Sequence, residues 1–324
     1  MVFRNSRDNC SKAAAGRARD PLGRMLAQAL DHLKRSRNLD LGGYRRATLR
    51  QRLGDRMEQA GISDPSEYLA RLYSDPAECD RLIGVLAVNV TSFFRDPVVF
   101  EVLAQSILPD IVSKAARRKC REVRVWCAGC ATGEEAYSVS MLLHGALKNE
   151  ERPVRPLVFG TDINEKSLQA AGRGSYRREK MENVKLGVLD RYFIQSGEEQ
   201  EVHPEIKNMV AFSGDDLTAG ERFAPAQSVF GGFDLVLCRN VLIYFSKELQ
   251  EAVLGKLHRS LDAGGILVLG SAEFLGGAAA GGFRTVDVRN RIFRKTGESL
   301  SPAVASPSGE KTEILPFAVK RRDK

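Results

Sequence analysis

The sequence predicts an α/β fold with a Rossmann-like, mostly parallel sheet, preceded by a small all-helical domain. Apolar strand-like runs within residues 123–137, 156–164, 233–245 and 264–274 alternate with helical patterns, and this alternation calls for parallel strands with crossover helices. The first run leads through a Gly-containing turn and two acids into a helix, as nucleotide-binding sites often begin. Ahead of these runs, residues 21–87 have the pattern of short helices separated by turns.

Changes in composition divide the chain into domains. Residues 1–20 are polar, basic and small, so we expect a disordered tail there. We assign residues 21–112 to the helical domain with its linker, and residues 113–296 to the α/β domain. Residues 297–324 are rich in Ser, Pro and charge, which predicts a second disordered tail.

The turn after the first strand favours a nucleoside ligand without a phosphate chain. Its AGCATG sequence lacks the third glycine of a dinucleotide fingerprint and has no GKS or GKT run. Gly129 and Gly133 carry no Cβ, so the backbone can approach a ligand closely. Asp162 ends the next strand, where an acid can accept hydrogen bonds from both ribose hydroxyls. An ordinary buried strand with a tight turn remains the alternative for this segment taken alone.

The cysteines and histidines give little support for metal or nucleophilic chemistry. Cys127 and Cys130 form a lone CxxC, and a zinc site would need two further ligands that the sequence does not offer. We therefore interpret them as small residues of the turn and predict no metal. The four histidines are scattered, which disfavours a Ser/His/Asp hydrolase.

Composition is that of a globular protein with more than one domain. The 324 residues are 43% hydrophobic and 28% charged. No apolar run reaches about 18 residues and the N-terminus has no apolar secretory signal, so we expect no membrane insertion. The six cysteines have no dense spacing pattern, which predicts reduced thiols and a cytoplasmic location.

A net charge of +8 indicates either an acidic partner or nucleic acid. Residues 43–58 concentrate this charge at helical spacing, with Leu49, Leu53 and Met57 as the buried stripe. The basic residues on its two flanks are Arg45, Arg46, Arg50, Arg52 and Arg56. A solvated helix face is the alternative to a docking surface.

Five motifs, in order, resemble one family. They are NVTSFFRDP, WCAGCATGEEAYS, FGTDIN, RGSYR and FDLVLCRNVLIYF, and the resemblance covers about residues 21–296. The set is similar to the CheR-type chemoreceptor methyltransferases. These enzymes transfer a methyl group from S-adenosyl-L-methionine to glutamate side chains on the cytoplasmic domains of bacterial chemoreceptors, leaving S-adenosyl-L-homocysteine.

The resemblance implies further structure and partners. It places a small antiparallel β insertion at about residues 183–212. It makes the helical cytoplasmic bundle of a methyl-accepting chemotaxis protein the substrate, so we favour the five arginines as a docking surface. Residues 193–212 are shorter than in members that bind a receptor C-terminal pentapeptide, so we expect independence from that tether. We also expect a monomer.

The resemblance also implies a set of site residues. The cofactor-binding residues would be Asn89, Thr91, Arg95, Gly129, Glu135, Asp162, Asp216, Leu217, Asn240 and Val241. Glu135 would bind the ammonium of the cofactor, Asp216 and Leu217 would flank its adenine, and Asn240 and Val241 would lie beside its sulfur. Arg95 would also orient the substrate carboxylate, and Tyr244 would lie near the acceptor, so these two are the predicted catalytic residues.

The predicted reaction needs no general base. A glutamate side chain, with a pKa of about 4.3, is already ionised at neutral pH. Two alternatives remain, an RNA methyltransferase and a cofactor-sensing scaffold without activity. The RNA methyltransferase is disfavoured because the sequence has no run of exposed aromatics beside the arginines on which bases could stack. We expect a protein partner and not nucleic acid.

Overall fold

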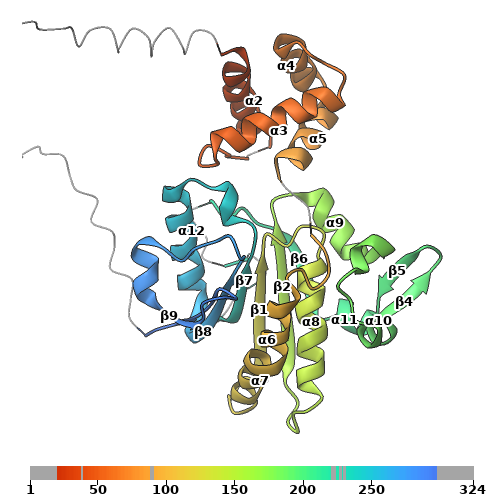
Figure 1. The fold of residues 1–324 in the computed structure, drawn as a ribbon, viewed down its shortest axis with the longest axis vertical. Coiled ribbons are helices and arrows are strands. Elements are labelled where there is room, and N and C mark those ends of the chain that lie inside the picture. Colours follow the sequence, from red (N-terminus) through yellow and green to blue (C-terminus); the bar gives the residue numbers. More distant parts are fainter. Residues whose placement is uncertain are drawn as a thin grey trace, which may run out of the picture.

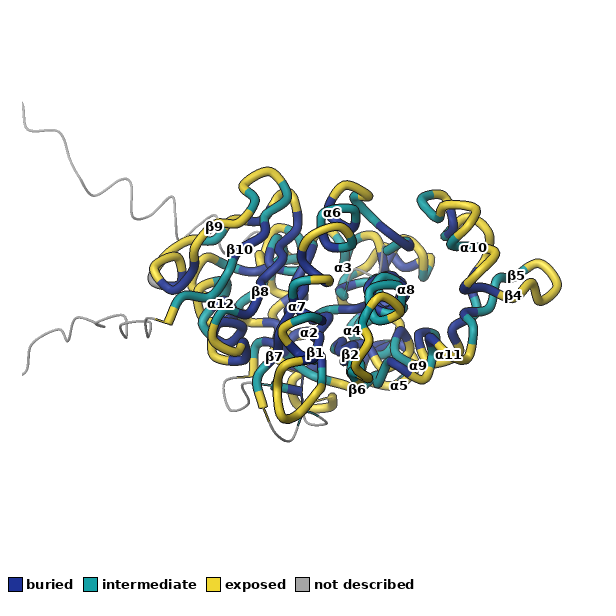
Figure 2. Tube along the Cα trace, turned by 90° about the horizontal axis from the view of Figure 1, so that it is seen from below, coloured by how far each residue is buried: buried dark blue, intermediate teal, exposed yellow. Residues whose placement is uncertain are grey.

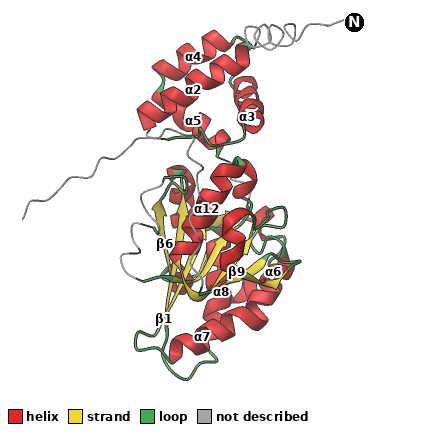
Figure 3. Cartoon of the chain, turned by 90° about the vertical axis from the view of Figure 1, so that its left-hand side faces the viewer, coloured by secondary structure: helices red, strands yellow, loops and turns green. Residues whose placement is uncertain are grey.

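The computed structural model has two parts, a helical unit and an α/β domain (Figure 1). It describes residues 20–37, 39–87, 91–219, 224–225, 228 and 231–297. Apart from Asp20 and Gly297, the predicted tails therefore lie outside the described residues. The helical unit stands beyond one end of the sheet, at the top of Figure 3.

Among the described residues, four helices make up the helical unit: α2 (Pro21–Arg37), α3 (Arg46–Gln59), α4 (Pro65–Ser74) and α5 (Pro76–Leu86). Both α4 and α5 begin with proline, preceded by a capping aspartate whose side chain accepts a hydrogen bond from the backbone of the first turn. One apolar core, which includes Leu33, Leu53 and Leu82, joins all four helices. The alternating turn and helix signals of the sequence thus correspond to separate helices around one core.

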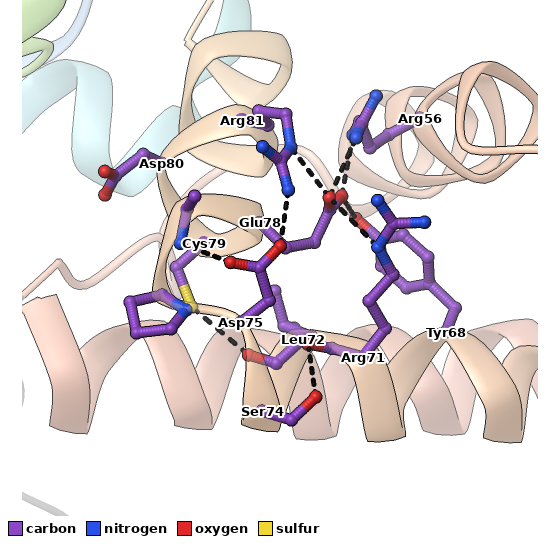
Figure 4. A network of polar contacts seen from close by, with 12 residues as sticks. Arg56, Tyr68, Arg71, Leu72, Ser74, Asp75, Glu78, Cys79, Asp80 and Arg81 are labelled. Atoms are coloured by element: carbon purple, nitrogen blue, oxygen red, sulfur yellow. Dashed lines mark hydrogen bonds and ion pairs between the residues drawn. The ribbon is translucent and has the colours of Figure 1, made fainter.

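A buried carboxylate lies inside this unit (Figure 4). The Glu78 side chain has no exposed surface and accepts hydrogen bonds from Arg56 Nε at 2.7 Å and Arg56 Nη2 at 2.8 Å. Tyr68 donates its hydroxyl at 2.9 Å, and Arg81 donates Nε at 2.9 Å. Burial by itself raises the pKa of Glu78, but the hydrogen bonds from Arg56, Arg81 and Tyr68 outweigh it and lower the pKa to about 2.

The main sheet has seven strands in the order β6-β2-β1-β7-β8-β10-β9. Their bounds are β1 (Glu122–Ala128), β2 (Arg155–Asp162), β6 (Val210–Gly214), β7 (Phe233–Cys238), β8 (Leu261–Leu269), β9 (Phe283–Asp287) and β10 (Ile292–Lys295). Strands β6, β2, β1, β7 and β8 run parallel to one another, and β10 is antiparallel to both of its neighbours. The predicted, mostly parallel sheet is confirmed, and β9 and β10 form a terminal hairpin. The strand order reverses at β1, where such sheets bind ligands.

Helices cover both faces of this sheet (Figure 1), and its central strands β1 and β7 are largely buried (Figure 2). Their bounds are α6 (Pro97–Val102), the π-helix η1 (Leu103–Ile107), α7 (Leu108–Ala116), α8 (Glu134–Leu147), α9 (Glu165–Arg173), the 3₁₀ helix η3 (Leu242–Tyr244), α12 (Lys247–Ser260) and η4 (Gly277–Gly282). Residues 93–112, at the end of the stretch that we assign to the helical domain with its linker, pack into the core of the α/β domain. Their apolar side chains, such as Phe100 and Leu108, meet the sheet and not α2–α5.

A second, three-stranded antiparallel sheet forms the predicted insertion. Its order is β3 (Ser175–Arg177), β5 (Glu199–Val202) and β4 (Phe193–Ser196). The helices η2 (Arg178–Met181), α10 (Leu186–Tyr192) and α11 (Pro204–Lys207) accompany it. The predicted bounds of 183–212 were inexact, because the insertion begins at Ser175 and residues 210–212 pair with β2 in the main sheet.

Candidate functional site

One pocket lies at the carboxyl ends of β1, β2 and β7, where the helical unit meets the sheet. Its empty volume is about 960 Å³, open solvent at its mouth included. The structure brings together almost all predicted site residues in its wall: Thr91, Arg95, Gly129, Glu135, Asp162, Asp216, Leu217, Asn240, Val241 and Tyr244. Asn89 lies outside the described residues.

The turn after β1 forms the floor of the pocket. Gly129 has a φ of +74°, and a Cβ there would lie 2.5 Å from Val241 Cγ2. The amides of Gly129 and Cys130 donate to the Thr161 carbonyl at 2.8 and 2.9 Å, which ties the turn to the end of β2. Only glycine combines this backbone conformation with this close approach.

Asp162 lies at the end of β2 with 8% of its surface exposed. Its Oδ2 accepts from Ala131 N at 2.8 Å, and its Oδ1 accepts from Asn164 N at 2.9 Å. Burial raises the pKa of Asp162 despite these hydrogen bonds. A carboxylate has about four acceptor positions, so acceptor capacity remains for hydroxyl groups of a ligand.

Glu135, in the first turn of α8, faces a buried arginine that the sequence analysis did not include. Arg239 Nη1 donates to Glu135 Oε2 at 3.1 Å, and Nη2 donates to Asp96 Oδ2 at 2.6 Å and to the Arg95 carbonyl at 3.0 Å. Burial raises the pKa of Glu135, and the charge of Arg239 opposes that rise. The sequence signal for Arg239 was its position directly after β7, the same edge that Asp162 occupies.

Glu273 is a further residue that the sequence analysis did not include, and its carboxylate holds the segment after β7. Asn240 has a φ of +60°, and the chain turns there into η3. Glu273 accepts from the amides of Val241 at 2.8 Å and Leu242 at 2.7 Å, and also from Gly270 N at 2.6 Å. Glu273 therefore fixes the backbone that carries Asn240 and Val241, which we predict to lie beside the sulfur of the cofactor.

The helical unit closes the pocket and contacts Tyr244. Arg45 N donates to the Tyr244 carbonyl at 2.9 Å, and Tyr44 forms a β-bridge with Phe245. The Arg52 guanidinium lies 4.6 Å from the centre of the Tyr244 ring and donates to the Leu86 carbonyl at 2.7 Å. Tyr44, absent from our predicted site, lines the pocket, and burial raises its pKa.

The five predicted docking arginines do not form one surface. The prediction for Arg56 was wrong: its surface is 8% exposed and its guanidinium is hydrogen-bonded to buried Glu78, so it is not available for docking. Arg45 and Arg52 contact the α/β domain. Arg46 and Arg50 are exposed, and Arg50 pairs with Asp20. The helical period predicts which residues share a flank, but not which flank meets another helix.

In the part of the chain that the structure describes, no three His, Cys, Asp or Glu side chains are grouped so that they could hold a metal ion. None of the described helices is long and apolar enough to cross a membrane. Cys127 and Cys130 are buried, and burial raises the pKa of both thiols.

The fold and the pocket define the class of an S-adenosylmethionine-dependent methyltransferase. Residues 89–292 match the family "CheR methyltransferase, SAM binding domain", and residues 24–87 match "CheR methyltransferase, all-alpha domain". The chain belongs to the CheR methyltransferase family.

Curated relatives agree with this assignment. The chain is 34% identical over 239 residues to the chemotaxis protein methyltransferase of Escherichia coli, covering 72% of this chain and 78% of that protein. It is 34% identical to the putative methyltransferase Cher3 of Pseudomonas putida, covering 84% of this chain and 96% of the relative. An uncharacterized 104.1 kDa protein of Rhodobacter capsulatus is 31% identical over 91% of this chain, which spans only 30% of that protein.

Likeness to solved structures is weaker. The magnesium protoporphyrin IX methyltransferase of Synechocystis, solved with bound SAH, is 21% identical, with a TM-score of 0.31, over 74% of this chain and 94% of that chain. This likeness carries no argument about the site.

The pocket fits S-adenosylmethionine on its own chemistry. The Asp162 carboxylate at the end of β2 suits the ribose hydroxyls, and the Glu135 carboxylate in the first turn of α8 suits the ammonium group. Gly129 permits close approach of the backbone to the ligand. Arg239 in the pocket wall donates to Glu135, to Asp96 and to the Arg95 carbonyl, so its guanidinium holds these segments of the wall together. Bound there, the cofactor would supply an electrophilic methyl group.

Proposed function

We propose that this protein methylates glutamate side chains on the cytoplasmic helical bundle of chemoreceptors, forming γ-carboxyl methyl esters. The observation that carries the proposal is that Arg95 and Tyr244 face the same pocket as the cofactor-binding residues. A cytoplasmic location, a monomeric state and independence from a receptor pentapeptide belong to this proposal. The names of the chemotaxis relatives support it.

The residues of the site would act by binding and orientation. Asp162 would accept from the ribose, Glu135 would bind the ammonium, and Asp216 with Leu217 would flank the adenine. Arg95 would align the substrate carboxylate, and such alignment can contribute several kcal/mol to lowering a barrier. The glutamate needs no general base because it is ionised at neutral pH.

Transfer of tritiated methyl from S-adenosylmethionine to purified receptor cytoplasmic domains tests the proposal. We expect label on the receptor that mild base releases as methanol, because esters of this kind hydrolyse readily. Arg95→Ala should lose most of this turnover, whereas an inactive cofactor-sensing scaffold would have none to lose. Total RNA serves as a parallel acceptor, and stable label on RNA would replace the proposal with the RNA methyltransferase alternative.

A second measurement tests the tether. A synthetic peptide with the C-terminal sequence of a receptor is titrated into the protein and followed by calorimetry. We expect no binding at micromolar concentrations, because the stretch from Phe193 to Phe212 is short. Micromolar affinity would show that this part of the proposal is wrong.

A further inference from the structure

We propose that Arg239 is a positioning residue for methyl transfer, which holds the Arg95 loop and the Glu135 carboxylate in one fixed arrangement. The inference rests on the proposed roles of Arg95 and Glu135 and adds the residue through which both are placed. Arg239 acts through these two residues.

The geometry joins three segments that are distant in sequence. The Arg239 side chain is 1% exposed, and its guanidinium bonds Glu135 on α8, Asp96 at the start of α6 and the Arg95 carbonyl. The partners lie 104 and 143 residues away along the chain. A planar guanidinium can serve all three acceptors at once, whereas a lysine ammonium on one flexible stem cannot match this fork.

The loop that carries Arg95 needs such support. Phe94 has a φ of 50° and Asp96 a φ of 60°, left-handed values that side-chain-bearing residues seldom adopt. Backbone of this kind persists where surrounding contacts enforce it. Phe94 N donates to Ser138 Oγ at 3.0 Å on one side of Arg95, and Arg239 holds Asp96 on the other. Loss of Arg239 should therefore displace the Arg95 side chain.

Arg239 also sets the charge of Glu135. Burial, and after it the charge of Glu273, favours the protonated acid, whereas the charges of Arg239 and, less strongly, Arg95 favour the carboxylate. Without Arg239 the pKa of Glu135 should rise further, so the carboxylate would take up a proton at a higher pH. A protonated Glu135 would bind the cofactor ammonium poorly.

Calorimetric titration with S-adenosylhomocysteine between pH 4.5 and about pH 8.5 tests the inference, because burial raises the pKa of Glu135 from its ordinary 4.5. Arg239→Gln should weaken binding at neutral pH on the order of 10- to 100-fold, as expected when a hydrogen-bonded charge loses its partner. The pH at which binding is half lost should also move upward. Arg239→Lys keeps the charge, so its pH midpoint should stay close to that of the unchanged protein while kcat toward receptor falls.

Arg118→Gln is the matched control. It breaks an ion pair with Asp234 at the start of the same strand, β7, away from the pocket. This variant should leave the dissociation constant and the pH midpoint unchanged. If Arg239→Gln behaved as Arg118→Gln does, or weakened binding without moving the pH midpoint, the inference would be wrong.

Two further variants separate the inference from the proposed function. If Glu135→Gln bound S-adenosylhomocysteine as tightly as the unchanged protein, the proposed role of Glu135 would fail. If Glu135→Gln lost binding while Arg239→Gln kept it, only the inference about Arg239 would fail. If Arg239→Gln does not fold, Asp96→Asn tests the inference instead, because it weakens the bond between Arg239 and the loop that carries Arg95. In Asp96→Asn the kcat should fall while the cofactor affinity stays unchanged, and an unchanged kcat would overturn the inference.

Discussion

At the scale of the residue, the structure places charge where the chain can neutralise it. Glu78 has no exposed surface and is surrounded by donors from Arg56, Tyr68 and Arg81. Removing one partner of a buried ion pair leaves the other charge uncompensated, at a cost of about 3–5 kcal/mol. The helical unit therefore depends on a polar cluster as well as on its apolar core.

We predict that Glu78→Gln lowers the free energy of unfolding by about 3 kcal/mol or more at neutral pH. Urea unfolding measures this, and Glu101→Gln, which removes a surface ion pair with Lys185 and alters a 3.5 Å hydrogen bond from Gln105, serves as the control. Equal stabilities of the two variants would contradict the prediction.

The same carboxylate predicts a dependence of stability on pH. The pKa of Glu78 is about 2 in the folded protein, below its ordinary 4.5, so folding favours the ionised form. Its contribution is fully present above pH 4.5 and is lost as the pH falls toward about 2. Urea titrations over this interval should show a loss of about 3 kcal/mol that Glu78→Gln lacks. Equal slopes in both proteins would contradict this assignment.

Gly129 predicts a steric effect on the pocket. Gly129→Ala should weaken cofactor binding and lower stability, because the new Cβ would meet Val241 Cγ2 at 2.5 Å with φ at +74°. The additional Val241→Ala change should recover only part of the stability, since the backbone strain of about 1 kcal/mol remains. Thermal unfolding with and without S-adenosylhomocysteine measures both effects. Gly214→Ala, with no atom within 4 Å of its Cβ, is the control.

At the scale of the element, α3 serves two purposes along one side, because Arg52 and Arg56 lie one turn apart. Its Arg56 stabilises the helical unit, while Arg52 packs on Tyr244 of the α/β domain. Arg46 and Arg50 remain exposed, so they carry what is left of the predicted docking surface. A docking role for α3 therefore depends on the exposed flank alone.

We predict that Arg46→Glu with Arg50→Glu raises the KM for receptor without changing cofactor affinity. Charges at the rim of an interface act mainly on the association rate, so the difference should shrink as salt rises. Arg284→Glu with Arg289→Glu makes the same charge change at exposed positions of the β9 edge. A KM that responds equally in both double variants would indicate net charge and not docking on α3.

At the scale of the whole molecule, the pocket couples the two parts of the chain. Tyr44 and Leu86 of the helical unit share its wall with Asp162 and Asn240 of the α/β domain. A ligand that contacts both parts stabilises their association, and at 100 times its Kd it adds about 2.7 kcal/mol. Cofactor binding should therefore order the contact between the two units.

Hydrogen exchange tests this coupling. S-adenosylhomocysteine should increase protection of amides near Tyr44 and Leu86 as well as those after β1, because the ligand bridges both. Tyr44→Ala should reduce the effect in the helical unit more than in the sheet, whereas Tyr73→Ala, 51% exposed on α4, should leave it unchanged. Protection confined to the α/β domain would contradict the prediction.

The fold class, the family and most of the pocket could be predicted from the amino-acid sequence. Strand and helix periods are local, and the carboxyl ends of parallel strands necessarily meet at one edge, so Gly129, Asp162 and Asn240 could be grouped without coordinates.

Only the tertiary structure decided which charges are partners. Arg56 meets Glu78 across 22 residues, and Arg239 meets Glu135 across 104. Periodicity shows the flank of an element on which an arginine lies, but not the surface packed against that flank. The packing of the elements therefore removed Arg56 from the docking surface and brought Arg239 into the site.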